Sequence, residues 1–442
     1  MDQSKSNLTW DQILSFWLPL EATWLMMALE GPLLSAIIAR LAEPKFNLAA
    51  YGVAFSLTLF IEAPILMIIS ASTTLVRDRI SFIRLHRFTL TLSGLLSSLM
   101  VIMLIPSIFY FLAEKVLGLP QNIARLTHMA AILLIPMPWA IGYRRFYQGV
   151  LIRNNRTRFV AFGTAIRLIT IILTSTLLYL FLPLQGSFIG ALALSISVLV
   201  EALASRLMAR NIVNKLLSES SEKEGREPPL TYRTIIQFYL PLAMTSFLAL
   251  GTQPLVTFFV AHGRMAIESL AVLPVIFGLV FIFMSFGLSY HEGSIALLGE
   301  QQRNFKPLRN FAFGLGALTV GILGLISFTP LSYFWFHKVS GLSLELTRFA
   351  LLPLKILTPL PAIWVFLTFQ RSVLVNARQT RPITWATGLE LMLIVMTLFM
   401  AIRYFDTVGV VAAALALVIG RIGANTYLLH PFLKALKKAR LR

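Results

Sequence analysis

Apolar residues in this 442-residue chain gather into long runs that alternate with short polar segments. A bilayer core about 30 Å thick is crossed by about 20 helical residues, because each residue advances an α-helix by about 1.5 Å. Twelve apolar runs reach that length; they lie near residues 13–40, 48–75, 88–113, 127–150, 159–183, 187–212, 234–261, 268–298, 310–336, 346–374, 383–403 and 407–432. The pattern therefore predicts an all-α integral membrane protein with twelve transmembrane helices.

The two halves of the chain share a pattern of prolines. The stretch Phe16-Trp17-Leu18-Pro19-Leu20 returns 222 residues later as Phe238-Tyr239-Leu240-Pro241-Leu242. With one inserted residue, Pro136-Met137-Pro138 falls on Pro359-Leu360-Pro361. Prolines that repeat in register are uncommon by chance, so we interpret the chain as duplicated. Six spans in each half give the two halves the same orientation, as in transporters built from parallel repeats.

One strongly polar linker, residues 218–232, separates the sixth and seventh runs. We therefore expect an N-terminal six-helix lobe, residues 1–217, and a C-terminal six-helix lobe, residues 233–442. In transporters with parallel repeats, the axis that relates the halves runs along the membrane normal. We expect the substrate path to lie between the two lobes.

Composition and charge agree with a membrane protein. Hydrophobic residues make up 57% of the chain, charged residues 13%, and the mean hydropathy is +0.78, whereas soluble domains carry roughly 25% charged residues. The net charge of +19 lies mostly in alternate connections, with Arg77, Arg153 and Lys306 among their basic residues. The positive-inside rule then places both termini in the cytoplasm. We expect a multi-pass protein of the cell's inner membrane, with the lipid bilayer rather than nucleic acid as its partner.

Ionisable side chains within the spans are the candidate functional residues, because they are costly in lipid unless they face a cavity or a partner. Glu30 precedes Gly31-Pro32, and Pro32 leaves a helix carbonyl without its usual donor. Glu62 precedes Ala63-Pro64 in the second run. A carboxyl group buried with few partners can exchange a proton in the physiological range. We predict that Glu30 and Glu62 couple transport to a proton or cation; the alternative is that both acids have structural partners.

Four further charges are candidates for binding substrate. Arg167 and Glu390 are equivalent at a shift of 223 residues and carry opposite charges. They form either an ion pair between the lobes or separate contacts within each lobe. Lys355 and Arg421 are the predicted anion-binding residues, with structural pairs to carboxylates as the alternative. Arg144 and Arg145 lie between Tyr143 and Phe146-Tyr147, about two helical turns from the cytoplasmic end of their span. They either form a cationic aromatic patch or extend their long side chains to the interface, and we expect the second.

Motifs for enzyme chemistry are absent from the sequence. There is no cysteine, no glycine-rich phosphate loop, no nucleophile elbow and no His-Glu-x-x-His motif. A lipid-modifying enzyme would need a convergent set of histidine with serine or aspartate at one membrane depth, and the sequence offers none. We therefore expect no enzyme activity, no metal site and no cofactor.

Several stretches resemble one known family. The segment Leu48–Leu57, which reads LAAYGVAFSL, is similar to that family's L-A-x-Y-G-x-A-x-S-L. The other matching stretches are Pro241-Leu242-Ala243 with Pro254-Leu255-Val256, Glu268–Leu273, and Pro353-Leu354-Lys355-Ile356. Together they resemble the progressive ankylosis family of the multidrug/oligosaccharidyl-lipid/polysaccharide (MOP) exporter superfamily, related to the MATE transporters. The resemblance implies a MATE-like fold of two six-helix lobes with a central cleft, and export of small polyanions such as pyrophosphate, nucleotides or carboxylates.

We predict a secondary transporter that exports small organic or phosphate-type anions by alternating access between the two lobes. Its partners would be an anionic small molecule and a coupling proton or cation. Two alternatives stay open. A multidrug antiporter driven by protons or cations would need an acidic cleft, and a flippase for a lipid-linked or amphiphilic substrate would need a basic cleft that opens sideways to lipid.

Overall fold

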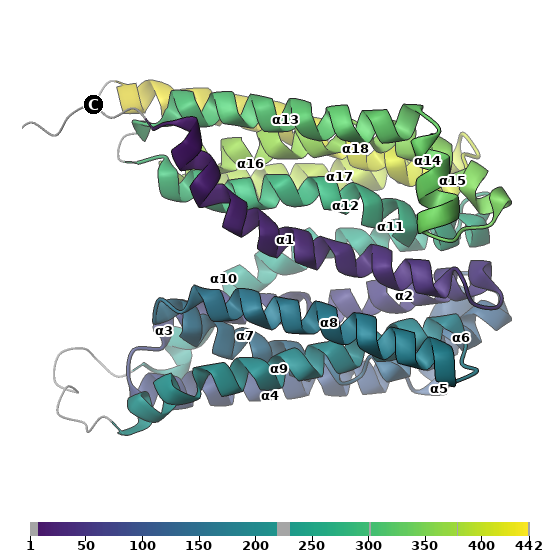
Figure 1. The fold of residues 1–442 in the computed structure, drawn as a ribbon, viewed down its shortest axis with the longest axis horizontal. Helices are drawn as coiled ribbons and strands as arrows, with labels where there is room; N and C mark the ends of the chain where they lie inside the picture. Colours follow the sequence, from purple (N-terminus) through teal and green to yellow (C-terminus); the bar gives the residue numbers. More distant parts are fainter. Residues whose placement is uncertain (1–7, 219–229, 300–301, 378, 441–442) are drawn as a thin grey trace, which may run out of the picture. The chain divides into compact units, whose positions relative to one another are not determined.

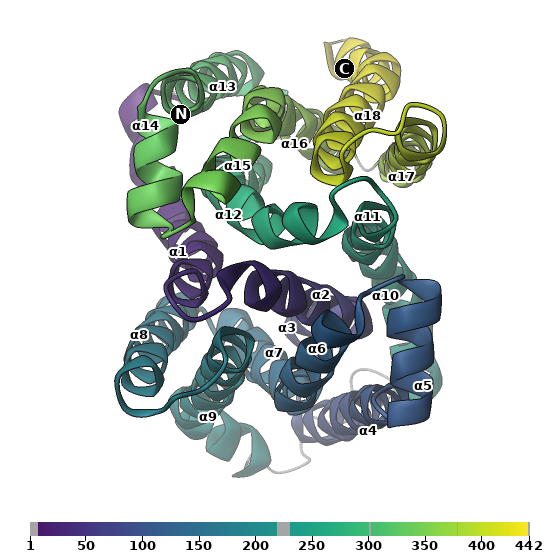
Figure 2. The same cartoon turned by 90° about the vertical axis from the view of Figure 1, so that its right-hand side faces the viewer.

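The computed structural model describes residues 8–218, 230–299, 302–377 and 379–440, and those residues form helices joined by short connections. Within them, twelve helical segments are long and apolar enough to cross a membrane. This confirms the predicted all-α membrane fold and the number of spans. The segments run side by side within each part of the chain (Figures 1 and 2).

Contacts between residues divide the chain into two compact units, unit 1 (Met1–Arg40 with Phe259–Arg442) and unit 2 (Leu41–Phe258). The helices of unit 2 are α2 (Pro44–Glu62), η1 (Ala63–Met67), α3 (Ile68–Leu75), α4 (Arg79–Met103), α5 (Pro106–Tyr110), η2 (Phe111–Val116), α6 (Gln121–Leu133), α7 (Met137–Arg153), α8 (Thr157–Phe181), α9 (Gly186–Ser218) and α10 (Tyr232–Leu250). Those of unit 1 are α1 (Trp10–Ile38), α12 (Ala266–Leu297), α13 (Phe305–Phe328), α14 (Leu331–Tyr333), η5 (Phe334–Val339), α15 (Leu344–Leu357), α16 (Leu360–Asn376), α17 (Arg381–Arg403) and α18 (Gly409–Arg440). Helix α11 (Thr252–Ala261) contains the junction between the units.

The first and seventh spans each pack outside their own half of the sequence. In unit 1, Trp17 of α1 donates its indole N–H to Ser289 of α12 at 2.8 Å. In unit 2, the hydroxyl of Tyr239 on α10 donates to the carbonyl of Pro64 in η1. Helix α1 of the first span therefore packs with the C-terminal half, and helix α10 of the seventh span packs with the N-terminal half. The lobes at 1–217 and 233–442 stay a prediction about the duplicated sequence.

The backbone repeats the duplication that the prolines predict. Phe111–Val116 and Phe334–Val339 both form π-helical turns, and corresponding residues of the two turns are 223 positions apart. Two residues after each turn comes a glycine with positive φ, Gly118 at 65° and Gly341 at 75°. A left-handed backbone favours glycine because a Cβ atom is strained there. The same unusual local structure thus occurs at matching places in both halves.

The second span, Pro44–Leu75, contains a break that positions a buried acid. Helix α2 ends at Glu62, and the next five residues form the 3₁₀ turn η1. Proline lacks an N–H and cannot continue the α-helical bonding pattern, so Pro64 accounts for the change. Beyond the break, α3 lies so close to α7 that a Cβ atom on Gly149 would fall 2.5 Å from the Cβ atom of Ser72.

Candidate functional site

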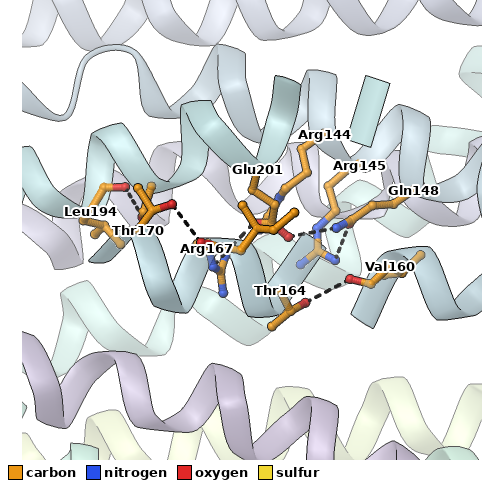
Figure 3. Close-up of polar contacts among 11 residues, drawn as sticks. Arg144, Arg145, Gln148, Val160, Thr164, Arg167, Thr170, Leu194 and Glu201 are labelled. Carbon is orange, nitrogen blue, oxygen red and sulfur yellow. Dashed lines mark hydrogen bonds and ion pairs between the residues drawn. The ribbon is translucent and has the colours of Figure 1, made fainter. Parts of the chain in front are cut away.

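Three helices of unit 2 bring two arginines to one fully buried acid (Figure 3). Glu201 of α9 has no exposed surface, and Arg144 of α7 donates from Nη1 to its Oε2 atom. The Nε atom of Arg167 on α8 lies 3.4 Å from the same oxygen. Gln148, one turn after Arg144, donates to Oε1 at 3.1 Å. We refer to Arg144, Arg167 and Glu201 as the unit 2 cluster, and its formal charge is positive.

In the unit 2 cluster, the acid has more of its hydrogen-bonding capacity satisfied than Arg144 has. Both oxygens of Glu201 accept hydrogen bonds, from Arg144 and from Gln148. The Nε–H group of Arg144 is buried and has no hydrogen-bond acceptor among the residues that the structure describes. A buried donor without an acceptor is costly. The cluster therefore offers a guanidinium N–H to an acceptor that the described residues do not supply.

A second cluster lies in unit 1, and we refer to Arg371, Glu390 and Arg421 as the unit 1 cluster. Arg421 of α18 donates from Nη1 to Oε2 of Glu390 on α17 at 2.9 Å, and the same nitrogen lies 2.7 Å from Oε1. The Nη2 atom of Arg371 on α16 is 3.9 Å from Oε2 and donates to Thr387 at 3.3 Å. Here again two arginines share one acid.

Trp364 of α16 lies beneath both arginines of the unit 1 cluster. The guanidinium carbons of Arg421 and Arg371 are 3.9 Å and 5.7 Å from the centre of its ring. The negative face of an indole attracts such cations. Within the described ranges, the Nε–H groups of Arg371 and Arg421 have no acceptor. The unit 1 cluster therefore also holds guanidinium donors that an anion could bind.

The two clusters take their acid and one of their bases from opposite helices of an equivalent helix pair. In unit 2 the base comes from α8 and the acid from α9, whereas in unit 1 the acid comes from α17 and the base from α18. Arg167 on α8 and Glu390 on α17 are repeat equivalents, so the base of one unit stands where the other has the acid. The structure gives each of them a partner within its own unit, Glu201 for Arg167 and Arg421 for Glu390. This is the second of the two arrangements that the sequence left open for the two residues.

The two acids predicted to couple transport lie in different units. Glu62 of unit 2 is 2% exposed, and its Oε1 atom has no hydrogen-bond partner among the described residues. The charged side chain that acts on it is Arg144, which is also the partner of Glu201. Glu30 of unit 1 is half-buried on α1, two residues before Pro32. Glu62 thus has the geometry of a carboxyl group that lacks a full set of partners.

Lys355 does not join either cluster. It is exposed on α15, and its ammonium group lies 5.8 Å from the centre of the Phe328 ring. It forms no ion pair with the residues that the structure describes. Its role in binding substrate therefore stays a prediction, whereas Arg421, Arg167 and Glu390 all lie within the two clusters.

Several residues of this arrangement were not among the predicted site residues. The expectation that Arg144 extends to the interface is wrong, because its side chain is buried against Glu201. Arg371 and Trp364 were not selected at all. A usable signal was the pair of repeat-equivalent glutamines, Gln148 and Gln370, since the cluster arginines Arg144 and Arg371 lie within one turn of them on α7 and α16.

Metal ligands do not converge in the part of the chain that the structure describes. No group of three or more His, Asp or Glu side chains there is placed to hold a metal ion. Both clusters can bind anions through their guanidinium groups and can exchange partners between acids and bases.

Solved structures of membrane transporters share this fold at low sequence identity. A multidrug resistance MATE family transporter of the MOP superfamily, in an inward-facing conformation, matches with a TM-score of 0.75 and 14% identity, over 96% of this chain and 98% of its own. The lipid II flippase MurJ, in an inward closed conformation, matches at 0.71 and 16%, over 96% and 91%. A MOP superfamily transporter from Pyrococcus furiosus, described as having a binding pocket of reverse polarity, matches at 0.62 and 14%, over 97% and 96%.

These similarities show a MATE-like fold, as expected from the sequence. No curated protein sequence matches the chain. A family model described as progressive ankylosis protein (ANKH) matches residues 1–288, which is more than half of the chain. The family and the fold agree with the expectation of a membrane transporter rather than an enzyme. The chain belongs to the progressive ankylosis protein (ANKH) family.

Proposed function

We propose that the protein is a secondary transporter that exports small organic or phosphate-type anions by alternating access between its two six-span lobes. One observation carries the proposal: each unit holds two arginines around a single acid, with buried guanidinium N–H donors that find no acceptor among the described residues. Arginine is suited to this role because its planar donors match carboxylate and phosphate oxygens. The substrate's oxygens would supply the missing acceptors.

The sign of the buried charge argues against a transporter of lipophilic cations. Each cluster has one more base than acids, and a buried positive charge repels a cationic drug. The transporter from Pyrococcus furiosus is described as having a binding pocket of reverse polarity that suggests a different function. We extend that reasoning to this chain, in which positive clusters favour anions.

A flippase for an amphiphilic anion is the second candidate, and the apolar groove in unit 2 favours it. Pro64, Phe88, Leu92, Tyr239 and Phe247 are among the residues that line this groove, whose volume is about 340 Å³. Its lining is apolar, as an acyl chain would require. The lipid II flippase MurJ shares the fold. We favour small anions because the groove by itself offers no charged group to a lipid headgroup.

Glu30 and Glu62 keep their proposed role as coupling acids. Glu62 is the better supported of the two, since its Oε1 atom lacks a partner among the described residues and its neighbour Arg144 also binds Glu201. When Glu62 is protonated, Arg144 would pair with Glu201 alone. When Glu62 is ionised, Glu62 and Glu201 would compete for Arg144. Lys355 stays a proposed anion-binding residue in spite of its separation from the unit 1 cluster.

Transport by the purified protein in proteoliposomes tests this proposal. Labelled citrate, ATP and pyrophosphate are compared with ethidium and with a fluorescent anionic lipid, with and without a proton gradient. Uptake of at least one small anion above that of protein-free vesicles is the expected result. Ethidium transport alone would favour the multidrug alternative, and translocation of the lipid alone would favour the flippase.

A further inference from the structure

A buried acid in unit 1 takes no part in either cluster. Glu21 lies eleven residues into α1 and is 5% exposed. Ser285 of α12 donates its hydroxyl to Oε1 at 2.9 Å, and Ser289, one turn further on, donates to Oε2 at 2.5 Å. Trp17, one turn before Glu21, donates its indole N–H to the Ser289 oxygen at 2.8 Å. Four side chains of two spans thus form one connected polar group inside a membrane helix pair.

This group contains no base. Among the described residues, no lysine, arginine or histidine forms an ion pair with Glu21, and the groups acting on its carboxyl are the two serines. An ionised carboxylate without a counter-charge is costly in an apolar interior, even when hydroxyl groups solvate it in part. Protonation removes this cost, because a neutral carboxyl group needs no counter-charge.

The charged and titratable groups of the neighbouring helices are directed elsewhere. On α12, Tyr290 donates to the carbonyl of Leu308, and His291 bonds to Thr368 and Ser372 of α16. Glu292 is exposed and pairs with Trp24. The remaining groups on these helices are Asp11 and Glu30 on α1, Glu268 in the first turn of α12, and the exposed Lys306 and Arg309 on α13, while Arg40 follows the end of α1. None of these supplies Glu21 with a counter-ion.

The serines can satisfy Glu21 in both of its protonation states. The hydroxyl of Ser285 also lies 2.6 Å from the carbonyl oxygen of Ile282, and that of Ser289 lies 3.0 Å from the carbonyl oxygen of Phe286. When Glu21 is ionised, both hydroxyls can donate to its oxygens. When Glu21 is protonated, its own O–H can donate to a serine oxygen while the serines donate to these carbonyls. A proton can thus arrive or leave without stranding a buried polar group.

We infer that Glu21 is a proton-binding site that couples transport to the proton gradient, with Ser285 and Ser289 as its positioning residues. The inference rests on the proposed transport function for its physiological role, although the proton site itself does not. A metal ion fits poorly, because hard cations take about six or more oxygen ligands and this group offers one carboxylate and two hydroxyls. Because Glu21 joins α1 to α12, its charge would act on the packing of these two spans.

Infrared difference spectroscopy of the reconstituted full-length protein, taken between low and high pH, tests the site directly. The wild type should show the carbonyl band of a protonated carboxyl group that disappears as pH rises. Glu21→Gln should lose the part of this band that comes from Glu21, with any contribution of Glu62 remaining, and Glu345→Gln, which changes an exposed acid of the same unit, should keep the whole band. Ser289→Ala should retain the band to higher pH, since a hydrogen bond donated to the carboxylate favours its charged form. An unchanged spectrum in Glu21→Gln would overturn the inference.

Flux measurements then separate the coupling role from the transport function. Anion uptake is recorded with and without an imposed proton gradient, and the ratio of the two rates is compared between variants. The gradient should change the rate in the wild type and in Glu345→Gln but not in Glu21→Gln. A gradient effect that persists in Glu21→Gln would contradict the coupling role. No anion uptake by the wild type would contradict the proposed function, while the infrared result would still decide the proton site.

Discussion

Arg421 of α18 donates to Glu390 of α17 at 2.9 Å. In unit 2 the corresponding helices are α9 and α8, and each of them supplies a residue of the opposite charge. There the acid, Glu201, comes from α9, and the base, Arg167, comes from α8. A third helix adds an arginine in each unit, Arg371 or Arg144. Both units therefore hold two bases around one acid although the repeat-equivalent positions of Arg167 and Glu390 carry opposite charges.

The unit 1 cluster should behave as an energetically coupled set. Glu390→Gln leaves two half-buried arginines without a counter-charge, and its cost should stay below the about 3–5 kcal/mol of breaking a fully buried ion pair. In the double variant Glu390→Gln/Arg421→Gln, the loss should be smaller than the sum of the two single losses. Unfolding of the purified protein in detergent measures these differences. Strictly additive losses would mean that the ion pair contributes nothing to stability.

Gly149→Ala should destabilise unit 2. A Cβ atom there would lie 2.5 Å from the Cβ atom of Ser72 and 2.7 Å from the carbonyl oxygen of Ile69. Overpacking of this kind costs about 1–3 kcal/mol. Gly94→Ala is the matched control in α4, because nothing lies within 4 Å of its Cβ position. Thermal unfolding should separate the two variants, and equal stability would contradict the close contact between α3 and α7.

Arg40→Ala should loosen the turn that follows η5. The Nη2 atom of Arg40 donates to the carbonyls of Lys338 and Val339 at 2.8 Å and 2.9 Å. Hydrogen bonds from a charged group contribute about 1.5–3 kcal/mol each. Hydrogen exchange at the amides of Ser340 and Leu342, which close this turn, should become faster.

Arg264→Ala is the control for the Arg40 experiment in the same unit. Its ion pair with Asp406 is 3.8 Å long, and the two side chains are 60% and 81% exposed. Such surface pairs contribute about 0–1 kcal/mol. Exchange at the amides of Ser340 and Leu342 should therefore match the wild type. Faster exchange in both variants would show that the effect does not come from the Arg40 contacts.

The predicted orientation can be tested because the chain contains no cysteine. Single cysteines are introduced at the exposed positions Thr157, at the start of the fifth span, and Asn122, at the start of the fourth span. In intact cells an impermeant maleimide should label Asn122→Cys, while Thr157→Cys should react only after the membrane is opened. The reverse pattern would place the termini outside the cell.

The number of spans and the duplication could be predicted from the sequence, because both depend on local patterns. Run length decides whether a helix can cross a bilayer. The proline register survives in the structure as paired elements, such as the π-helical turns at Phe111–Val116 and Phe334–Val339. The break after Glu62 also follows from a local cause, since Pro64 lacks a donor.

The partners of the buried charges could not be predicted in the same way. Arg144 meets Glu201, which is 57 positions away, and Glu21 meets serines more than 260 positions away. A long side chain in a span can either reach the interface or turn inward, and the packing of neighbouring helices decides between them. The sequence singles out Arg167, Glu390 and Arg421 as unusual but does not indicate which residue each one contacts.

The most direct test of the proposal compares anion uptake by cluster variants in proteoliposomes. Arg144→Gln and Arg421→Gln remove one guanidinium from each cluster, and Arg158→Gln removes an exposed arginine of α8 as the control. Arg144→Gln/Glu201→Gln removes acid and base together, so that Glu201 is not left as a buried acid without Arg144.

The account predicts saturable uptake of citrate, ATP or pyrophosphate by the wild type and by Arg158→Gln. In the Arg144 and Arg421 variants the loss should be at least about tenfold, which corresponds to roughly 1.4 kcal/mol of binding energy. Anion uptake that is equal in all variants, or transport of ethidium without any anion, would contradict the assignment of the two clusters.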